Sequence, residues 1–180
     1  QIGSLRTLTE IAFYLGRQFR GMLPCAQQMV LILMNAGRDG FFLVSGEDSQ
    51  FLGDGPHAQE LRDWLAETQE PRLVQRTKAL LSLGIQRGAP CVLVPIRNES
   101  ESLGAMLILC REGCGCEAKE LNSIAMLLGQ SVGVLRRAVL DEEDARDSRR
   151  RFEVSTEFAG IIGKDPKMHG IYTMIQDIAP

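Results

Sequence analysis

Three of the five cysteines in this sequence lie in one short segment, and their spacing suggests chemistry. The first, Cys110, ends an apolar run. The glycine-rich turn that follows this run contains Cys114 and Cys116. Thiolates are soft ligands, so sulfurs this close together could hold a zinc ion or an iron–sulfur cluster. The spacing Cys-x-x-x-Cys-x-Cys is not a standard metal-binding pattern, and a fourth ligand would have to come from elsewhere: Cys25, Cys91, His57 or a partner chain.

Two other interpretations of the cysteines stay open. Cys114 and Cys116 alone could form a redox pair, or the thiols could be structural. Cys25 and Cys91 lie among apolar residues, where an unpaired cysteine behaves as a small hydrophobe.

The sequence also indicates a compartment. No run is long and apolar enough to span a membrane and no signal peptide is visible, so we expect a cytoplasmic protein with reduced or metal-bound thiols.

Composition and charge narrow the function classes. The 180 residues are 44% hydrophobic and 24% charged, which is typical of one ordinary domain with some appended structure. With a net charge of −3, nothing in the composition indicates nucleic-acid binding through a basic surface. Neither His57 nor His169 has a nucleophile and an acid at a catalytic spacing, so we expect no catalytic site in these residues.

The elements that must position these residues follow from hydrophobic periodicity. Apolar residues at three- and four-residue steps predict helices at residues 4–18, with Ser4 as N-cap, 23–35 and 57–68. Aromatic and β-branched runs between turn residues predict strands at 41–44, 50–52, 72–74, 91–96 and 104–110. From residue 117 the apolar positions recur with nearly the period of a coiled coil, which predicts a long helix. Together these elements predict an α+β fold with an antiparallel sheet and flanking helices.

This order of elements resembles a GAF domain of the GAF/PAS superfold. The run LRDWLAETQEPRLV at residues 61–74 resembles the family's helix and short strand, and residues 92–109 resemble its late strand pair. The resemblance implies a small-molecule pocket covered by residues 75–89, where cationic side chains could meet an anionic effector. The pocket residues it implies are Trp64, Arg76, Lys78, Leu83 and Arg87.

The last residues carry a second resemblance. FAGIIGKDPKMHGIYTMIQDIAP at residues 158–180 resembles the opening of the AAA+ ATPase domain of bacterial sigma-54-dependent transcription activators. That resemblance implies that Ile161, Ile162 and Gly163 border the adenine of ATP in a longer protein. No Gly-x-x-x-x-Gly-Lys-Ser/Thr phosphate loop occurs in the sequence, so we expect ATP and Mg²⁺ to bind only in that longer protein and this stretch to be no enzyme.

These observations predict three parts: a GAF-like sensory domain at 1–140, a helical linker at 141–157 and the start of an AAA+ domain at 158–180. The sensory domain would bind a small, unidentified effector and control the ATPase through a homodimer formed by the helix at 117–151. Sigma-54 RNA polymerase and DNA would be reached only through other domains, and no membrane is involved. The alternatives are a cysteine-based metal, iron–sulfur or redox sensor, or a dimerisation module without a ligand.

Overall fold

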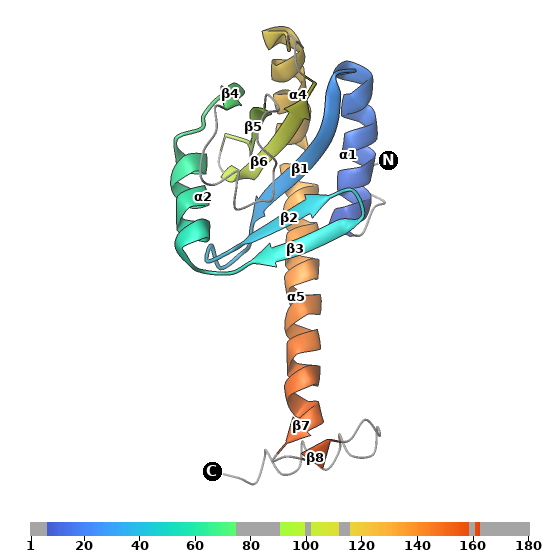
Figure 1. The fold of residues 1–180 in the computed structure, drawn as a ribbon, viewed down its shortest axis with the longest axis vertical. Coiled ribbons are helices and arrows are strands. Elements are labelled where there is room, and N and C mark those ends of the chain that lie inside the picture. The colour runs from blue at the N-terminus through green and yellow to red at the C-terminus, as the bar shows by residue number, and fades with distance from the viewer. Residues whose placement is uncertain (1–6, 75–90, 100–101, 112–115, 159–160, 163–180) are drawn as a thin grey trace. The chain divides into compact units, whose positions relative to one another are not determined.

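A computed structural model describes residues 7–74, 91–99, 102–111, 116–158 and 161–162. The chain divides into two compact units, Gln1–Leu140 and Asp141–Pro180. The first unit contains a six-stranded sheet in the order β3-β2-β1-β6-β5-β4, in which every neighbouring pair is antiparallel (Figure 1). Its strands are β1 (Ala26–Met34), β2 (Phe41–Ser45), β3 (Asp48–Leu52), β4 (Arg72–Val74), β5 (Cys91–Arg97) and β6 (Ser102–Cys110).

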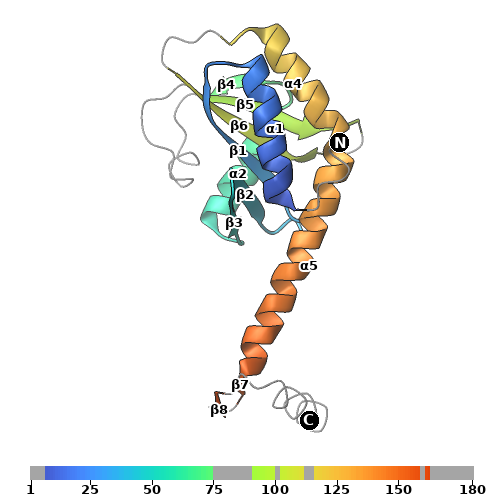
Figure 2. The same cartoon turned by 90° about the vertical axis from the view of Figure 1, so that its right-hand side faces the viewer.

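Helices cover both faces of this sheet, as Figure 2 shows. On one face pack α1 (Leu8–Met22), α4 (Ala118–Gln130) and the first turns of α5 (Val132–Thr156). On the other face packs α2 (Pro56–Ala66), around Leu61, Trp64 and Leu65. Since successive side chains of a strand point to opposite faces, the central strands supply both cores, and the predicted α+β architecture is confirmed.

The first helix begins later than the sequence pattern suggests. Ser4, the predicted N-cap, lies outside the described residues, and Thr7 caps α1 instead. The Thr7 hydroxyl accepts a hydrogen bond from the Glu10 amide, and the Glu10 carboxylate accepts one from the Thr7 amide, both at 3.2 Å. This reciprocal pair forms a capping box that fixes where the helix starts.

The helix predicted at residues 23–35 is wrong, because this segment forms β1 in the middle of the sheet. Val30 and Ile32 are buried against the α2 side, whereas Leu31 and Leu33 are buried on the α1 side. A strand that is buried on both faces reads as a continuous apolar run, which periodicity alone does not distinguish from a buried helix. Pairing with β2 on one edge and β6 on the other decides the conformation.

The remaining strands lie close to their predicted positions. β2 and β3 form a hairpin through Gly46, whose φ of +61° falls in the left-handed region that glycine tolerates. In β6, Gly104 has φ +151° and lies so close to β1 that a Cβ atom there would overlap the carbonyl oxygen of Ile32. This close approach requires glycine at position 104.

The two stretches of α5 differ in burial and charge. In the first, Val132, Leu135, Ala138 and Val139 are buried in the core of the first unit. In the second unit, Arg149 pairs with Glu142 at 3.4 Å on the exposed helix. The single long helix predicted from residue 117 is wrong, because α4 ends at Gln130 and α5 begins at Val132, with a bend of 57° between them. No single described helix is long and apolar enough to cross a membrane, and only this bent pair meets that test by length and composition.

After α5, two short strands pair antiparallel: β7 (Glu157–Phe158) and β8 (Ile161–Ile162). Ile161 and Ile162, which the sequence resemblance assigns to an adenine site, therefore form β8. Gly163 and the amphipathic run that follows it lie outside the described residues.

Candidate functional site

The β1–β6 ladder carries a different kind of chemistry at each of its two ends. The register pairs Ala26 with Cys110 at one end and Leu33 with Gly104 at the other. Sulfur atoms gather at the first end, whereas a pocket with two guanidinium groups lies beside the second.

The sulfur end consists of Cys25, Cys110 and Cys116, which we call the thiol cluster. Their three Sγ atoms lie within 4.8 Å of one another. The Sγ of Cys116 is 3.4 Å from that of Cys110 and 3.8 Å from that of Cys25. The backbone holds this arrangement, because the Arg111 amide donates a 3.1 Å hydrogen bond to the Cys25 carbonyl beside the end of the ladder.

The three cysteines of the cluster differ in burial and in oxidation state. Cys110 is buried, while Cys25 and Cys116 are half-buried. Burial, with smaller contributions from the neighbouring Cys116 and Cys91, raises the pKa of the Cys110 thiol to about 12. Cys25 is disulfide-bonded in this structure, whereas Cys91, Cys110 and Cys116 are free thiols. Cys110 is thus a neutral thiol at neutral pH and a poor nucleophile by itself.

The sequence analysis anticipated part of this cluster. It grouped Cys110 and Cys116 correctly, while Cys114 lies outside the described residues. Cys25 was interpreted as a small hydrophobe and was one of several candidates for a further ligand, and the β1–β6 pairing brings it into the cluster. Its proximity was invisible from the sequence because the segment after it was predicted as a helix.

Cys91 and His57 do not join the cluster. Cys91 pairs in register with Leu109 and shares its face of the sheet, opposite to the face of Cys110. Burial in that apolar core raises the pKa of the Cys91 thiol, in line with its expected role as a small hydrophobe. His57 is exposed in the first turn of α2.

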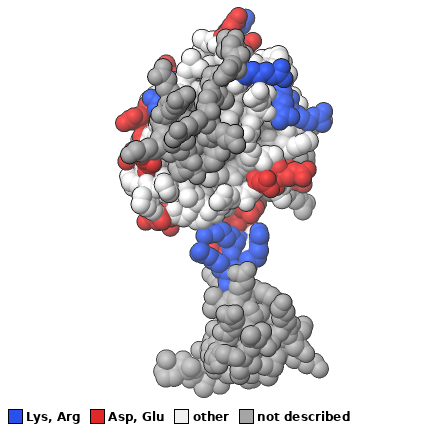
Figure 3. Space-filling model, viewed as in Figure 1, with Lys and Arg blue, Asp and Glu red and all other residues white. Residues whose placement is uncertain are grey.

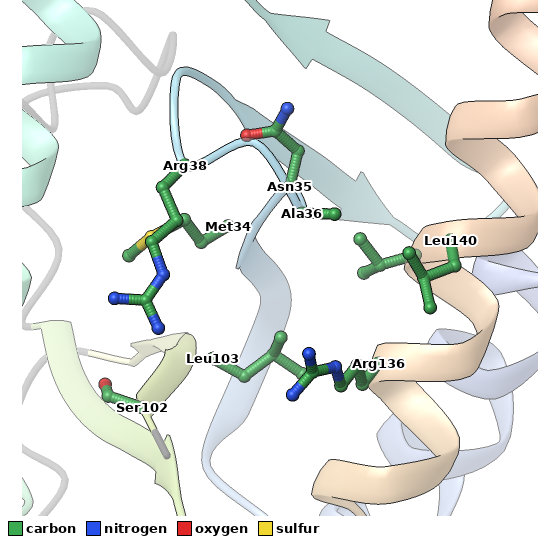
Figure 4. A pocket seen from close by; sticks show the side chains of 9 residues that line it. Met34, Asn35, Ala36, Arg38, Ser102, Leu103, Arg136 and Leu140 are labelled. Carbon is green, nitrogen blue, oxygen red and sulfur yellow. The ribbon is translucent and has the colours of Figure 1, made fainter.

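The other end of the ladder carries what we call the arginine pocket, with a cavity volume of about 340 Å³ (Figure 4). Arg38 from the β1–β2 turn and Arg136 from α5 both extend side chains into it. Two guanidinium groups suit the recognition of a carboxylate or phosphate. The lining residues are Met34, Asn35, Ala36, Arg38, Ser102, Leu103, Arg136, Val139 and Leu140.

Side-chain hydrogen bonds shape the turn that carries Arg38. The buried Asn35 accepts hydrogen bonds through Oδ1 from the amides of Asp39 at 3.1 Å and Gly40 at 2.9 Å. These bonds hold the turn while Arg38 adopts a left-handed φ of +57°.

A second clamp on the same turn comes from α2. The Arg62 guanidinium donates to the Arg38 carbonyl and to the Asp54 carboxylate, both at 2.9 Å. The hydrogen bond from Arg62 holds the pKa of the Asp54 carboxyl below its usual range, with help from the Gly55 amide. The turn that carries Arg38 is thereby tied to α2.

The pocket expected from the sequence involves other residues than the arginine pocket, and most of them are not described. Arg76, Lys78, Leu83 and Arg87 lie outside the described residues. Trp64 is 9% exposed and packs in the core beneath α2. Arg38 and Arg136 were missed, although Arg38 occupies the turn-forming sequence Asn-Ala-Gly-Arg-Asp-Gly at residues 35–40.

The described surface carries charges of both signs. On the face seen in Figure 3, acidic and basic side chains form small separate groups, and neither sign dominates among the described residues. This distribution agrees with the net charge of −3 and with the absence of a basic nucleic-acid-binding surface on that described face.

No protein-family model matches the sequence, and no curated protein is significantly similar to it. Solved structures do resemble it. The GAF domain of an Acinetobacter phosphoenolpyruvate-protein phosphotransferase aligns with a TM-score of 0.50 at 14% identity, covering 76% of this chain and 87% of that one. This chain has a GAF-type fold.

Two further structures resemble the GAF-type chain. A red/green cyanobacteriochrome in its red-light-absorbing state aligns with a TM-score of 0.51 at 15% identity, covering 72% of this chain and 94% of that one. A segment of a methyl-accepting chemotaxis protein aligns with a TM-score of 0.54 at 9% identity, covering 77% and 93%. The fold class predicted from the sequence is therefore confirmed.

Proposed function

We propose that this chain is the signal-sensing domain of a bacterial sigma-54-dependent transcription activator, and that α5 carries the ligand state to an attached AAA+ ATPase. The observation that carries the proposal is α5, which is anchored in the sensory core by Val132, Leu135 and Val139 and continues unbroken to Thr156. A helix packed on a domain core can shift as a rigid element when a ligand favours one packing arrangement.

The arginine pocket supplies a means of coupling. A small anion held between Arg38 and Arg136 would contact a turn of the sheet and the output helix at once. Val139 and Leu140 line the same pocket, so occupancy would bear directly on the last turns of α5 in the sensory unit. The effector class favoured by these contacts is a small carboxylate or phosphate.

The proposed partner is a second copy of the chain, paired through residues 117–151. Large hydrophobic side chains remain exposed on these helices: Met126 is 61% exposed, Leu127 37% and Leu140 38%. Burying such side chains against a second copy removes apolar surface from water. Dimerisation would bring two copies of α5 together and prepare the attached ATPase domains for ring assembly.

The sigma-54 context rests on residues 158–180, whose sequence resembles the opening of that ATPase domain. In this proposal ATP, Mg²⁺, sigma-54 polymerase and DNA are contacted by domains other than the sensory one, and the sensory unit itself performs no reaction. A coding sequence without a phosphate loop after Pro180 would contradict this context and leave the sensory domain attached to a different output.

The coupling through α5 is tested by insertions after Leu140 in the protein that includes the ATPase. Seven inserted helical residues rotate the output by only about −20°, whereas two rotate it by about 200°. We expect the seven-residue variant to keep effector-dependent transcription from a sigma-54 promoter and the two-residue variant to lose regulation. Equal behaviour of the two variants would mean that α5 is only a tether.

Self-association is tested separately by sedimentation of the 180-residue chain. Met126→Glu places a charge on the exposed face of α4 without touching the core, so it should shift the chain from dimer to monomer. The control is Thr9→Glu, at a half-exposed position of α1 outside the proposed interface. This variant should stay dimeric. A monomeric wild-type chain would contradict the proposed partner.

A further inference from the structure

We propose that the thiol cluster binds a single zinc ion in the reduced protein, with Cys25, Cys110 and Cys116 as ligands. This inference goes beyond the proposed function, which requires no metal. It rests on the distances between the three sulfur atoms, on the elements that hold them and on the chemistry of the group.

The sulfur separations match one tetrahedral ion. Zinc–sulfur bonds are about 2.3 Å long, so two sulfurs on one tetrahedral zinc lie about 3.8 Å apart. The Sγ atoms of Cys25 and Cys116 are 3.8 Å apart, and those of Cys110 and Cys116 are 3.4 Å apart. An iron–sulfur cluster divides its thiolates between different irons and therefore needs a wider spacing. The geometry favours a mononuclear site over a cluster.

Three different parts of the fold bring these ligands together. Cys25 directly precedes β1, Cys110 ends β6, and Cys116 comes just before α4. Backbone pairing of Ala26 with Cys110 brings the first two residues close together. Cys110 lies within a strand, and the other two ligands come from segments that border β1 and α4, so the site does not depend on one loop alone.

Sheet geometry also decides which other cysteine is excluded. Cys91 is on the neighbouring strand, but it faces the α2 core together with Leu109 and is absent from the three-sulfur group. Three thiolates leave one position of a tetrahedron for water. Cys91 is therefore a matched control: a buried cysteine close in space that should not bind the ion.

Zinc binding requires reduction of a disulfide and the loss of protons from the ligands. The disulfide at Cys25 must first be reduced, for which a dithiol suffices: it donates two electrons and two protons, yields two protein thiols and becomes a cyclic disulfide. Each of the three thiols then loses its proton on binding zinc, so uptake of one ion releases three protons to the buffer. Metal uptake is thus confined to the reduced protein, and oxidation of the thiolates would release the ion.

The test is a metal titration of the 180-residue chain, reduced and handled without oxygen. Co²⁺ is added first, because tetrahedral cobalt–thiolate sites have strong visible and near-ultraviolet bands, and Zn²⁺ then displaces it. We expect equimolar binding to the wild type. Cys116→Ser should lower zinc affinity more than about 100-fold, since even loss of an outer-shell partner costs about 10- to 100-fold. Cys91→Ser should bind like the wild type.

A third variant guards against loss of folding as the cause. Cys116→His keeps a zinc ligand at the half-buried position, so it should retain binding while the sulfur-to-cobalt band weakens. Circular dichroism should show the same fold for all variants. The proposal would be overturned if the reduced wild type bound no equimolar zinc, if Cys91→Ser and Cys116→Ser lost the ion equally, or if the protein contained iron with inorganic sulfide.

Discussion

The two ends of the β1–β6 ladder are built in different ways. The thiol cluster is fixed by backbone pairing between Ala26 and Cys110 and offers soft, partly buried sulfur atoms. The arginine pocket depends on side-chain contacts at the β1–β2 turn and offers hard cationic groups in a cavity of about 340 Å³. One end suits a thiophilic metal, and the other suits a small anion.

The difference matters because the two ends lie next to successive helices. Cys116 lies two residues before α4, and Arg136 belongs to α5. A ligand at each end would therefore lie beside a different one of two successive helices, near the start of α4 at one end and beside the turns of α5 up to Leu140 at the other. Separating the effects of substitutions at each end is the way to test this arrangement.

The largest expected effect comes from a substitution that disrupts the β1–β6 ladder, which carries both the thiol cluster and the arginine pocket. Gly104→Ala places a Cβ atom against the Ile32 carbonyl at a backbone conformation that strains any other residue, so we expect a loss of about 3 kcal/mol or more in unfolding free energy. Gly46→Ala is the control, because its φ is also positive but nothing lies near its Cβ position. It should cost only about 1–2 kcal/mol in urea unfolding, and equal losses would refute the close contact.

A smaller effect, the stabilisation by zinc, should distinguish the thiol cluster from the arginine pocket. Zinc at about 100 times its dissociation constant should stabilise the reduced wild type by roughly 2.7 kcal/mol, a rise of about 5–10 °C in Tm for a chain of this length. Differential scanning fluorimetry should show this shift in Arg136→Ala and not in Cys116→Ser. If Arg136→Ala also lost it, the two ends would not be independent.

Helix α5 can be stabilised without touching either end. Gly133 lies exposed in its first turns and has open space around its Cβ position. Gly133→Ala should raise the unfolding free energy by about 0.5–1 kcal/mol, because alanine loses less conformational entropy in a helix. Urea unfolding measures this gain, and a loss of stability would show that position 133 contacts another part of the protein.

The smallest effect concerns the clamp on the turn that carries Arg38. Because folding lowers the pKa of Asp54, its contribution to stability is present above the unfolded value of 3.8 and is lost as pH falls through the lower folded pKa. The wild type should therefore lose slightly more stability than Asp54→Asn when unfolding is followed from pH 5 downward. Identical pH profiles would mean that the Arg62 pair with Asp54 contributes nothing in solution.

Local patterns predicted most of the fold, while pairing across the sheet decided what they could not. Amphipathic periodicity located α1 and α2, and turn residues located the β2–β3 hairpin. The apolar run at Val30–Leu33 fits a strand or a helix equally well, and only its neighbours β2 and β6 select the strand.

The same limit applies to the sites. The sequence grouped Cys110 with Cys116 because they are close along the chain. Cys25 joins them only through the β1–β6 register, and Arg38 and Arg136 line one pocket although they are far apart in the sequence. Such contacts between distant segments leave no local periodic signal.

The central claim is that this domain senses a small anion through α5, and thermal unfolding tests it most directly. The 180-residue chain would be unfolded with inorganic phosphate and with a series of small mono- and dicarboxylates. The account predicts that one of these raises Tm by several degrees in the wild type and in Cys116→Ser, and that Arg38→Ala and Arg136→Ala each abolish the shift. An unchanged Tm with every anion would contradict the account and favour a dimerisation module without a ligand. A shift that survives both arginine substitutions would also contradict it, because the anion would then bind outside the arginine pocket.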